Sequence, residues 1–524
     1  MAVQTNPSIE EEEEEEEHEH EHNGPTHHPS PPSHEFFDLS TTVDPSYIIS
    51  LIRKLLPLDS SSVNQVVSDD PNRGSITDDK EEEAPSASIC NNEHIELSKS
   101  TSENMDVDVS CESSHTRGEC QDTGDGVERF GASVGEDAWE EYGCILWDLA
   151  ASKTHAELMV ENLILEVLYA NLIACKSERV TEISIGIIGN LACHEVPLNQ
   201  IVSTKGLIEI IVEKLFLDDP QCLCETCRLL TVGLQSGESI RWAEALQSEH
   251  ILCQILWIAE NTLNLQLLEK SVGLILAILE SQQKALDELL PPMLKLGLAS
   301  ILINLLTFEI SKLKRDERIP ERYSVLDSIL RAIEGLSVID EHSQEICSNK
   351  ELFHLVCDMV KFPDKVEVGN CCVTAAVLIA NILSDVADRA SEISHDSCLL
   401  GGLIDIFPFA SDDLEARNAL WNVLARIFVR IHETEMNSSS LFHLVSVLVR
   451  RIDLIEDELL NQQCVDSSPG STADPRKTSL MRITSIVNQW IAVKEDAENN
   501  GNAEGPVSEI DVKKLLDCCH KFSK

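Results

Sequence analysis

The sequence predicts an all-α protein built from stacked helical repeats and preceded by a disordered acidic tail. Three observations support this fold class. From Trp139 onward, Leu, Ile, Val and Ala recur at helical spacing between short polar turns, and no stretch alternates with the period of two that strands show. Similar apolar segments return about every 45 residues. About half of the net charge of -51 lies in the first quarter of the chain.

Residues 1–138 form the predicted tail. They carry 33 acidic and seven basic side chains, a net charge of -26, which leaves -25 for the remaining residues. Ser, Pro, Asn and Gly are abundant here, so the segment cannot bury enough apolar surface to offset the entropy of ordering it. The block Glu10–Glu17 runs into alternating histidines, which we interpret as a solvated low-complexity tract rather than a metal site.

One part of the tail, at about residues 44–56, predicts a short amphipathic helix. Asp44 suits the N-cap, Pro45 the first helical position, and Pro57 the stop. The expected apolar face consists of Ile48, Ile49, Ile52, Leu55 and Leu56. A helix of this length is marginal in water, so it needs a surface to pack on. Two alternatives remain open: packing in cis on the folded body, or binding in the groove of another protein.

Residues 139–460 form the predicted repeat domain. Segments such as ILWDLAA, IIGNLAC and LIANILS recur, and one aligned apolar position falls at Leu149, Leu191, Leu234, Leu279, Leu336, Ile382 and Ile427. The successive separations are 42, 43, 45, 57, 46 and 45 residues. A period near 45 with two or three helices per unit is typical of armadillo and HEAT repeats. The fold class is therefore an armadillo/HEAT-like right-handed superhelical solenoid.

Local signals predict where helices begin and end. The longest interval contains the charged stretch Glu309–Arg318, which indicates an inserted loop or a helix extension. Breaks between helices are expected at Asp219-Pro220, Pro291-Pro292, Pro363-Asp364 and Gly401-Gly402. Residues 461–524 are expected to hold two linkers and two C-terminal helices, at about 479–493 and 508–522.

Three segments carry a resemblance to a known family. TEISIGIIGNLACHE (Thr181–Glu195), the pair Trp147-Asp148 and DDPQCLCETCRLL (Asp218–Leu230) resemble the serum amyloid A-like 1 protein family, over roughly Tyr142–Glu280. The resemblance implies an acidic tail, a short hydrophobic helix and an armadillo-type body. It also implies a non-catalytic protein linked to cell proliferation in animals, located in the nucleus, with the cytoplasm as a further location. It supplies no catalytic residues.

The composition argues against several classes of partner and location. An acidic chain lacks the clustered Lys and Arg that nucleic acid or anionic lipid would require. No charge-free apolar run reaches 18 residues and the chain does not begin with a signal sequence, so neither a membrane helix nor secretion is expected. The 18 cysteines show no secreted spacing, which favours free, buried thiols in a reducing compartment. The expected partners are proteins that offer basic or hydrophobic segments.

No catalytic motif is visible, and no cofactor is expected. GxGxxG and GxxxxGK[ST] do not occur, and the strings that match HExxH (His18–His22) and GxSxG (Gly131–Gly135) lie in the segment expected to be disordered. The densest thiol cluster comprises Cys222, Cys224 and Cys227. If a helix begins at Pro220, Cys224 and Cys227 share a face while Cys222 points away, so three metal ligands would not converge. We therefore expect structural burial, and a thiol or zinc protein centred on Cys222–Cys227 is the weaker alternative.

The expected function is that of a protein-binding scaffold. Peptide-binding armadillo proteins grip an extended ligand with an Asn on one helix of each unit. The residue before each aligned apolar position is Asn at Asn190 and Asn381, while Asp148 and Arg426 occupy the same place in other units. These four residues are the candidate partner contacts, although Asn190 could instead bond to a neighbouring repeat. A second alternative is a regulatory module in which the helix at 44–56 covers the groove.

Overall fold

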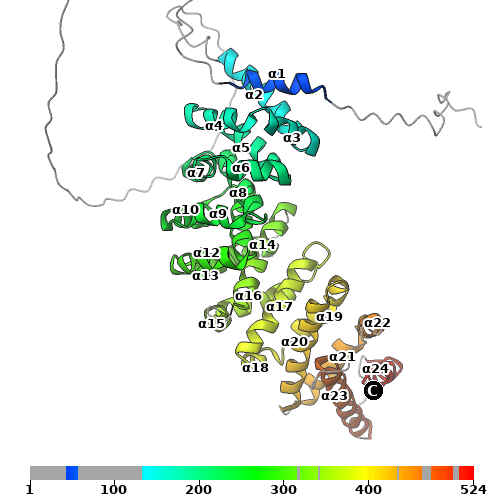
Figure 1. Ribbon diagram of the computed structural model, residues 1–524. Helices are drawn as coiled ribbons and strands as arrows, with labels where there is room; N and C mark the ends of the chain where they lie inside the picture. Colours follow the sequence, from blue (N-terminus) through cyan, green and yellow to red (C-terminus); the bar gives the residue numbers. More distant parts are fainter. Residues whose placement is uncertain are drawn as a thin grey trace, which may run out of the picture. The chain divides into compact units, whose positions relative to one another are not determined.

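A computed structural model describes residues 43–56, 133–315, 319–339, 343–433, 436–462, 474–499 and 507–523. By internal contacts the chain divides into Met1–Pro45 and Ser46–Lys524. All the packing described below lies within the second unit. Every regular element in the described ranges is helical, as Figure 1 shows. The all-α prediction is confirmed.

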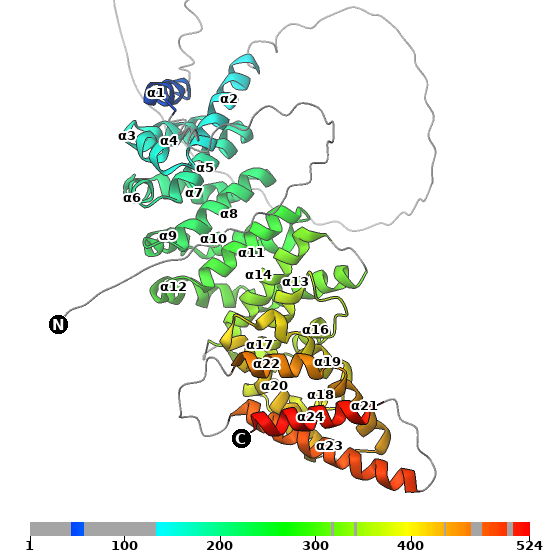
Figure 2. The same cartoon turned by 90° about the vertical axis from the view of Figure 1, so that its right-hand side faces the viewer.

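Eight long helices, which we call the ladder helices, pack on one another in chain order (Figures 1 and 2). All seven aligned apolar positions of the sequence lie on the first seven of these helices, one on each. The predicted period therefore reports the spacing of real neighbours, each covering the apolar stripe of the next. The ladder consists of α2 (Ser133–Leu149), α5 (Glu178–Ala192), α8 (Pro220–Leu234), α11 (Leu265–Leu279), α14 (Pro320–Ser337), α17 (Gly369–Asp385), α20 (Leu414–Glu433) and α23 (Pro475–Asn499).

Two further rows of helices complete the units. A second row packs behind the ladder and consists of α4 (Ile164–Ala174), α7 (Leu207–Glu213) with η1 (Lys214–Phe216), α10 (Glu249–Asn261), α13 (Leu298–Lys314), α16 (Lys350–Val360), α19 (Ser397–Asp405) and α21 (Ser438–Val449). Shorter helices join the two rows, namely α3 (Lys153–Glu161), α6 (Glu195–Ser203), α9 (Ser239–Leu246), α12 (Gln283–Lys295), α15 (Ser343–Ser348) and α18 (Arg389–Ile393). Three helices per unit is the armadillo arrangement.

Helix starts follow the local chemistry of the sequence. At the start of α8, the Asp219 side chain accepts a hydrogen bond from the Cys222 backbone N–H at 2.7 Å, and Pro220 occupies the first turn. This is the N-cap that the sequence predicts. α7 and α13 instead follow Gly206 and Gly297, whose φ angles of 84° and 94° lie in the left-handed region that favours glycine.

Two of the expected breaks are wrong. Pro291 and Pro292 lie inside α12, where Leu290 and Met293 are buried beside them; this packing keeps the helix intact and the chain turns later, at Gly297. Gly401-Gly402 lies inside α19. A Cβ on Gly402 would come within 2.4 Å of the Val360 carbonyl oxygen, so this glycine permits close packing of α16 rather than ending a helix.

The C-terminal part continues the stack beyond the expected end of the array at 460. α23 packs along α20, α24 (Glu509–Phe522) packs on α23, and α22 (Ile452–Gln462) packs on α24 (Figure 2). The charged stretch after Glu309 begins as an extension of α13, while residues 316–318 lie outside the described residues. Glu309 is buried there and pairs with Arg322 at 2.8 Å, which explains how a helix extension tolerates its charge.

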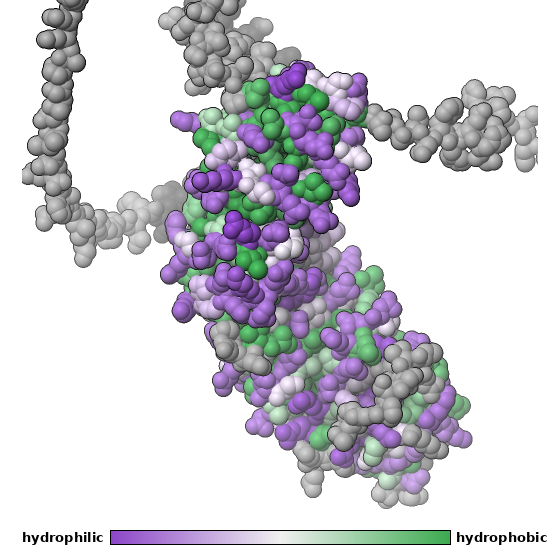
Figure 3. Space-filling view, viewed as in Figure 1, coloured by the Kyte–Doolittle hydropathy of each residue, from purple (hydrophilic) through white to green (hydrophobic). Residues whose placement is uncertain are grey.

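On the face shown in Figure 3, polar side chains surround smaller apolar patches. Within the described ranges, no single helix has the length and hydropathy of a membrane span. α12 and α13 reach that length and hydropathy only when they are taken together, and the two helices meet at a bend of 73°.

Candidate functional site

The candidate residue Asn190 fastens three ladder helices together. Its side-chain amide donates to the Trp147 carbonyl on α2 at 2.9 Å. Its side-chain oxygen accepts from the Arg228 guanidinium on α8 at 3.2 Å, and the same guanidinium donates to the Gly186 carbonyl at 3.2 Å. Both ends of the amide are thus engaged by the protein. The structure places Asn190 in the neighbouring-repeat role that the sequence left open.

The other three candidate residues lie on different ladder helices and form no single site with Asn190. Asn381 on α17 donates to the Ser337 hydroxyl on α14 at 2.9 Å. Arg426 on α20 donates to the Leu383 carbonyl of α17 at 2.7 Å. Asp148 is exposed on α2. Asn190, Asn381 and Arg426 therefore connect successive ladder helices.

A cavity of about 440 Å³ opens over the ladder where α14, α17 and the start of α20 meet η2 (Phe407–Ala410). The lining residues of α14 and of α17 are spaced by three, four or seven positions, so each of these two helices presents one face to the cavity. The sequence did not predict this site. It is lined by Asp327, Arg331, Glu334, Asn370, Val373, Thr374, Val377, Phe409, Asp413, Glu415 and Ala416.

The cavity is acidic, and its negative charge is poorly compensated. Burial raises the pKa of Asp327 and of Glu334, and the nearby carboxylates of Glu415 and Asp413 raise that of Glu334 further. The charge of Arg331 opposes both rises in pKa, and a hydrogen bond with Asn381 opposes the rise at Glu334. Arg331 also lines the cavity, but its guanidinium pairs with Glu280 on α11. None of the ion pairs in the described part of the chain involves the four cavity carboxylates. The site therefore favours a cation.

The helix at the tail, α1 (Pro45–Lys54), buries a different face from the one expected. Ile48, Ile52 and Leu55 are buried as predicted, but Leu56 is 52% exposed and Ile49 only half-buried. Leu51, which the sequence analysis missed, completes the buried stripe. Both the expected and the observed sets fall on one side of a helix, but the buried stripe is rotated away from Ile49 and Leu56 and toward Leu51.

α1 docks on α2 and α4, in the first helical repeat, and does not contribute to the acidic cavity. The Leu55 carbonyl accepts hydrogen bonds from the Trp139 indole on α2, at 3.2 Å, and from the Asn171 amide on α4, at 2.8 Å. The lining of the cavity over α14 and α17 includes no residue of α1. Of the two placements considered from the sequence, the structure shows α1 packed in cis.

The thiol cluster is a core element. Cys222, Cys224 and Cys227 are free and buried, and the Cys222 thiol donates to the Glu178 carbonyl at 3.1 Å. Burial raises the pKa of Cys224 and of Cys227 to about 12, so both remain thiols at neutral pH and are poor nucleophiles. Within the described ranges, no three His, Cys, Asp or Glu side chains gather to hold a metal ion.

A serine and a histidine meet in a separate cavity of about 310 Å³ between α19 and α21. His443 Nε2 lies 2.8 Å from the Ser397 hydroxyl, a pairing that in enzymes can activate a nucleophile. The neighbouring carboxylate of Asp396 does not orient this imidazole, because it accepts from the Leu399 N–H at 3.0 Å and pairs with Lys361 at 3.3 Å. Among the residues that the structure describes, no carboxylate is recorded as a hydrogen-bond partner of His443.

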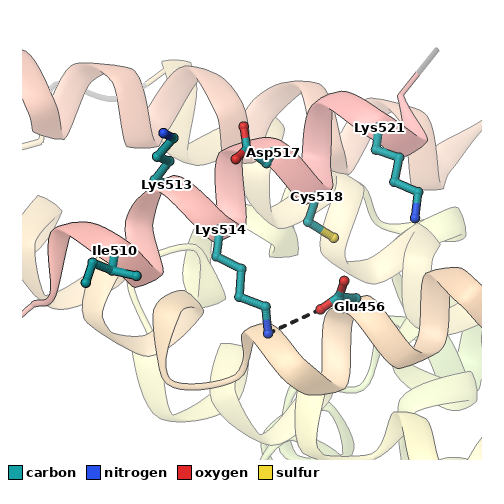
Figure 4. Close-up of a pocket in the computed structure, with 7 residues that line it drawn as sticks. All are labelled: Glu456, Ile510, Lys513, Lys514, Asp517, Cys518 and Lys521. Atoms are coloured by element: carbon teal, nitrogen blue, oxygen red, sulfur yellow. Dashed lines mark ion pairs between the residues drawn. The ribbon is translucent and has the colours of Figure 1, made fainter.

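A third cavity, of about 370 Å³, lies between α22 and α24 and is basic. Figure 4 shows Lys514 directed at Glu456, with Lys513 pointing away from it. Lys514 pairs with Glu456 at 3.2 Å and with Asp453 at 2.6 Å. This lysine is therefore already neutralised by α22, and its contacts fasten α24 to the end of the stack.

Comparison with known proteins agrees with the sequence resemblance. No family model matches the chain. Protein saal1 of Danio rerio is 28% identical over 300 residues, which cover 54% of this chain and 62% of that protein. Protein SAAL1 of Homo sapiens is 33% identical over 130 residues, or 24% and 27% of the two chains. The chain thus spans less than two thirds of the length of these relatives.

Solved structures of repeat proteins also match. A crystal structure of an engineered protein aligns with a TM-score of 0.45 at 16% identity, covering 74% of this chain and 84% of its own. A designed armadillo repeat protein aligns with a TM-score of 0.38 at 15% identity, covering 47% and 94%. The three-row order of the helices is that of an armadillo-like helical repeat fold, and part of the chain is similar in sequence to the SAAL1 proteins.

Proposed function

We propose that the protein is a non-catalytic scaffold whose ladder helices bind an extended, basic segment of a partner protein. The observation that carries this proposal is the acidic cavity over α14 and α17. Asp327 and Glu334 are partly buried there with raised pKa values, and Asp413 and Glu415 stand beside them. A lysine or arginine side chain entering the cavity would relieve this repulsion.

The shape and chemistry of the cavity suit a long cationic side chain. Val373 and Val377 of α17 provide an apolar wall, against which the methylene stem of Lys or Arg can pack. The ring of Phe409 is 40% exposed at the edge of the cavity, where a cation can lie over its face. Each hydrogen bond from the cation to a carboxylate is worth about 1.5–3 kcal/mol.

Binding of a labelled peptide of alternating lysine and serine to the full chain tests this proposal. The cavity variant is Asp327→Asn with Glu334→Gln. The matched control is Glu182→Gln with Glu225→Gln, which removes the same charge from carboxylates that already pair with Arg179 and Arg228, at 2.6 and 2.7 Å. All three proteins are compared at equal folding, established by circular dichroism.

The cavity variant is expected to bind the peptide at least about 10-fold more weakly, since one lost charged hydrogen bond exceeds 1.4 kcal/mol. The control is expected to stay within about 2-fold of the unmodified protein. An equal loss in both variants would mean that the peptide responds only to the overall negative charge, and the cavity assignment would then be wrong.

A further inference from the structure

α1 contacts the neighbouring helices in the way that a bound ligand contacts its site. A helix leaves its last carbonyl groups without partners inside the helix, and here two side chains from other helices capture the Leu55 carbonyl. The Trp139 indole donates at 3.2 Å and the Asn171 amide at 2.8 Å. Asn171 is only 4% exposed, and a buried amide without a partner is costly. The first helical repeat therefore presents two matched side-chain donors to the end of this helix.

Apolar and cationic contacts complete the docking of α1. The stripe Ile48, Leu51, Ile52 and Leu55 is at most 3% exposed, and the Lys54 ammonium lies 4.1 Å from the centroid of the Tyr142 ring on α2. α1 lies against α2 in both views of the ribbon (Figures 1 and 2). Spacing, carbonyl capture and the cation over the ring together specify which helix fits and in which direction.

α1 and the helices that it packs against are far apart in the sequence. Seventy-six residues, 57–132, separate α1 from the described start of α2. A helix as short as α1 is marginal in water by itself, so its folding and its docking are coupled. Because α1 belongs to the same chain as its binding surface, a free peptide must compete with an intramolecular ligand.

We propose that Trp139, Tyr142 and Asn171 form a helix-binding site that α1 occupies reversibly, and that the site accepts the α1 segment of a second copy when its own α1 is displaced. The site is distinct from the acidic cavity and stands independently of the function proposed for that cavity. It recognises an amphipathic helix with apolar side chains at i, i+3, i+4 and i+7 and a basic residue before its terminal carbonyl.

The test uses the full chain and a labelled peptide of residues 43–57. Leu55→Asp places a charge in the buried stripe and releases α1, whereas Leu56→Asp makes the same change one position on, at a side chain that is 52% exposed. The peptide should bind saturably to Leu55→Asp, and at least about 10-fold more weakly to Leu56→Asp and to the unmodified chain, in which α1 holds the site. Adding Asn171→Ala to Leu55→Asp should weaken peptide binding about 10-fold.

Absence of peptide binding to a folded Leu55→Asp protein would overturn the proposal, as would equal binding to all three proteins. If Leu55→Asp does not fold, a protease site placed within residues 57–132 of the otherwise unmodified chain gives the second measurement. After cleavage, native mass spectrometry should show the N-terminal fragment bound at micromolar concentration, and excess peptide should displace it. A fragment that separates at once, or that excess peptide never displaces, would equally refute reversible binding.

Discussion

The ion pair between Arg417 and Glu458 offers a sharp test of what holds the C-terminal end of the stack. Arg417 on α20 donates to a carboxylate oxygen of Glu458 on α22 at 3.1 Å, and the Trp421 indole donates to the same oxygen at 3.3 Å. The two charged side chains are only 5% and 4% exposed. Removing one partner would leave a buried charge without compensation.

We expect Arg417→Met to destabilise the region around α20 and α22 by about 3–5 kcal/mol, the usual cost of breaking a buried pair. The double variant, Arg417→Met with Glu458→Met, should recover most of this loss, because apolar side chains of similar volume replace both charges. The matched control is Arg241→Met, which breaks an exposed pair with Glu244 at 3.1 Å and should cost no more than about 1 kcal/mol.

Hydrogen exchange of peptides from α20 and α22 is the appropriate assay, since the units of a solenoid can open separately. Burial raises the pKa of Glu458 while Arg417 opposes that rise, so Arg417→Met raises the pKa further. A folded-state pKa above the unfolded value, near 4.3, means that stability falls as pH rises through the folded-state pKa. The deficit should therefore be larger at pH 8 than at pH 5. A deficit that ignores pH, or one equal to that of Arg241→Met, would refute the reasoning.

Three further predictions follow from burial and packing. Gly186→Ala should destabilise the fold by about 1–3 kcal/mol, because the new Cβ would lie 2.2 Å from an indole ring. Gly273→Ala has open space around it and should stabilise the fold by about 0.5–1 kcal/mol. Thermal unfolding of the two variants measures both changes. At pH 8 the native Cys224 thiol should resist a thiol reagent, since burial raises its pKa to about 12, while exposed Cys193 reacts; mass spectrometry of labelled peptides measures both. Because burial raises the pKa of Glu334, binding of the basic peptide should weaken on acidification at a pH above the ordinary range of carboxyl groups, and a binding titration against pH checks this.

The stacking of the units was predictable from the sequence because it depends on a regular physical requirement. Each ladder helix must cover the apolar stripe of the next, so the aligned positions from Leu149 to Ile427 recur at the spacing of the units. The start of α8 was predictable for a local reason, since Asp219 and Pro220 satisfy the first turn by themselves.

Positions where tertiary packing opposes a local signal were not predictable. Pro291-Pro292 reads as a break, yet buried neighbours hold α12 together on both sides. Gly401-Gly402 also reads as a break, but the reason for Gly402 lies on another helix, the Val360 carbonyl of α16. A single sequence cannot show whether a glycine ends its own helix or makes room for a neighbouring one.

The acidic cavity escaped the sequence analysis because its residues come from separate units. Asp327 and Glu415 both line it although they are 88 positions apart in the chain, which is the difference of their numbers. Attention to one aligned position per repeat selected Asn190 and Asn381 instead. The available signal was the spacing of acidic residues on α14, where Asp327 and Glu334 are seven apart and so share a face.

The sequence allowed two roles for Asn190, a contact with a partner or a bond to a neighbouring repeat. The two roles predict opposite results for one variant. If Asn190 joins units, Asn190→Ala leaves the Trp147 carbonyl and the Arg228 guanidinium without this partner, at a cost of about 1–3 kcal/mol. Hydrogen exchange should then rise in α2, α5 and α8, while the affinity for the basic peptide stays unchanged. A residue that gripped the ligand would do the reverse, because its removal would weaken binding and leave exchange in the three helices as it was. Both measurements on one variant thus separate a joint between repeats from a contact with a partner.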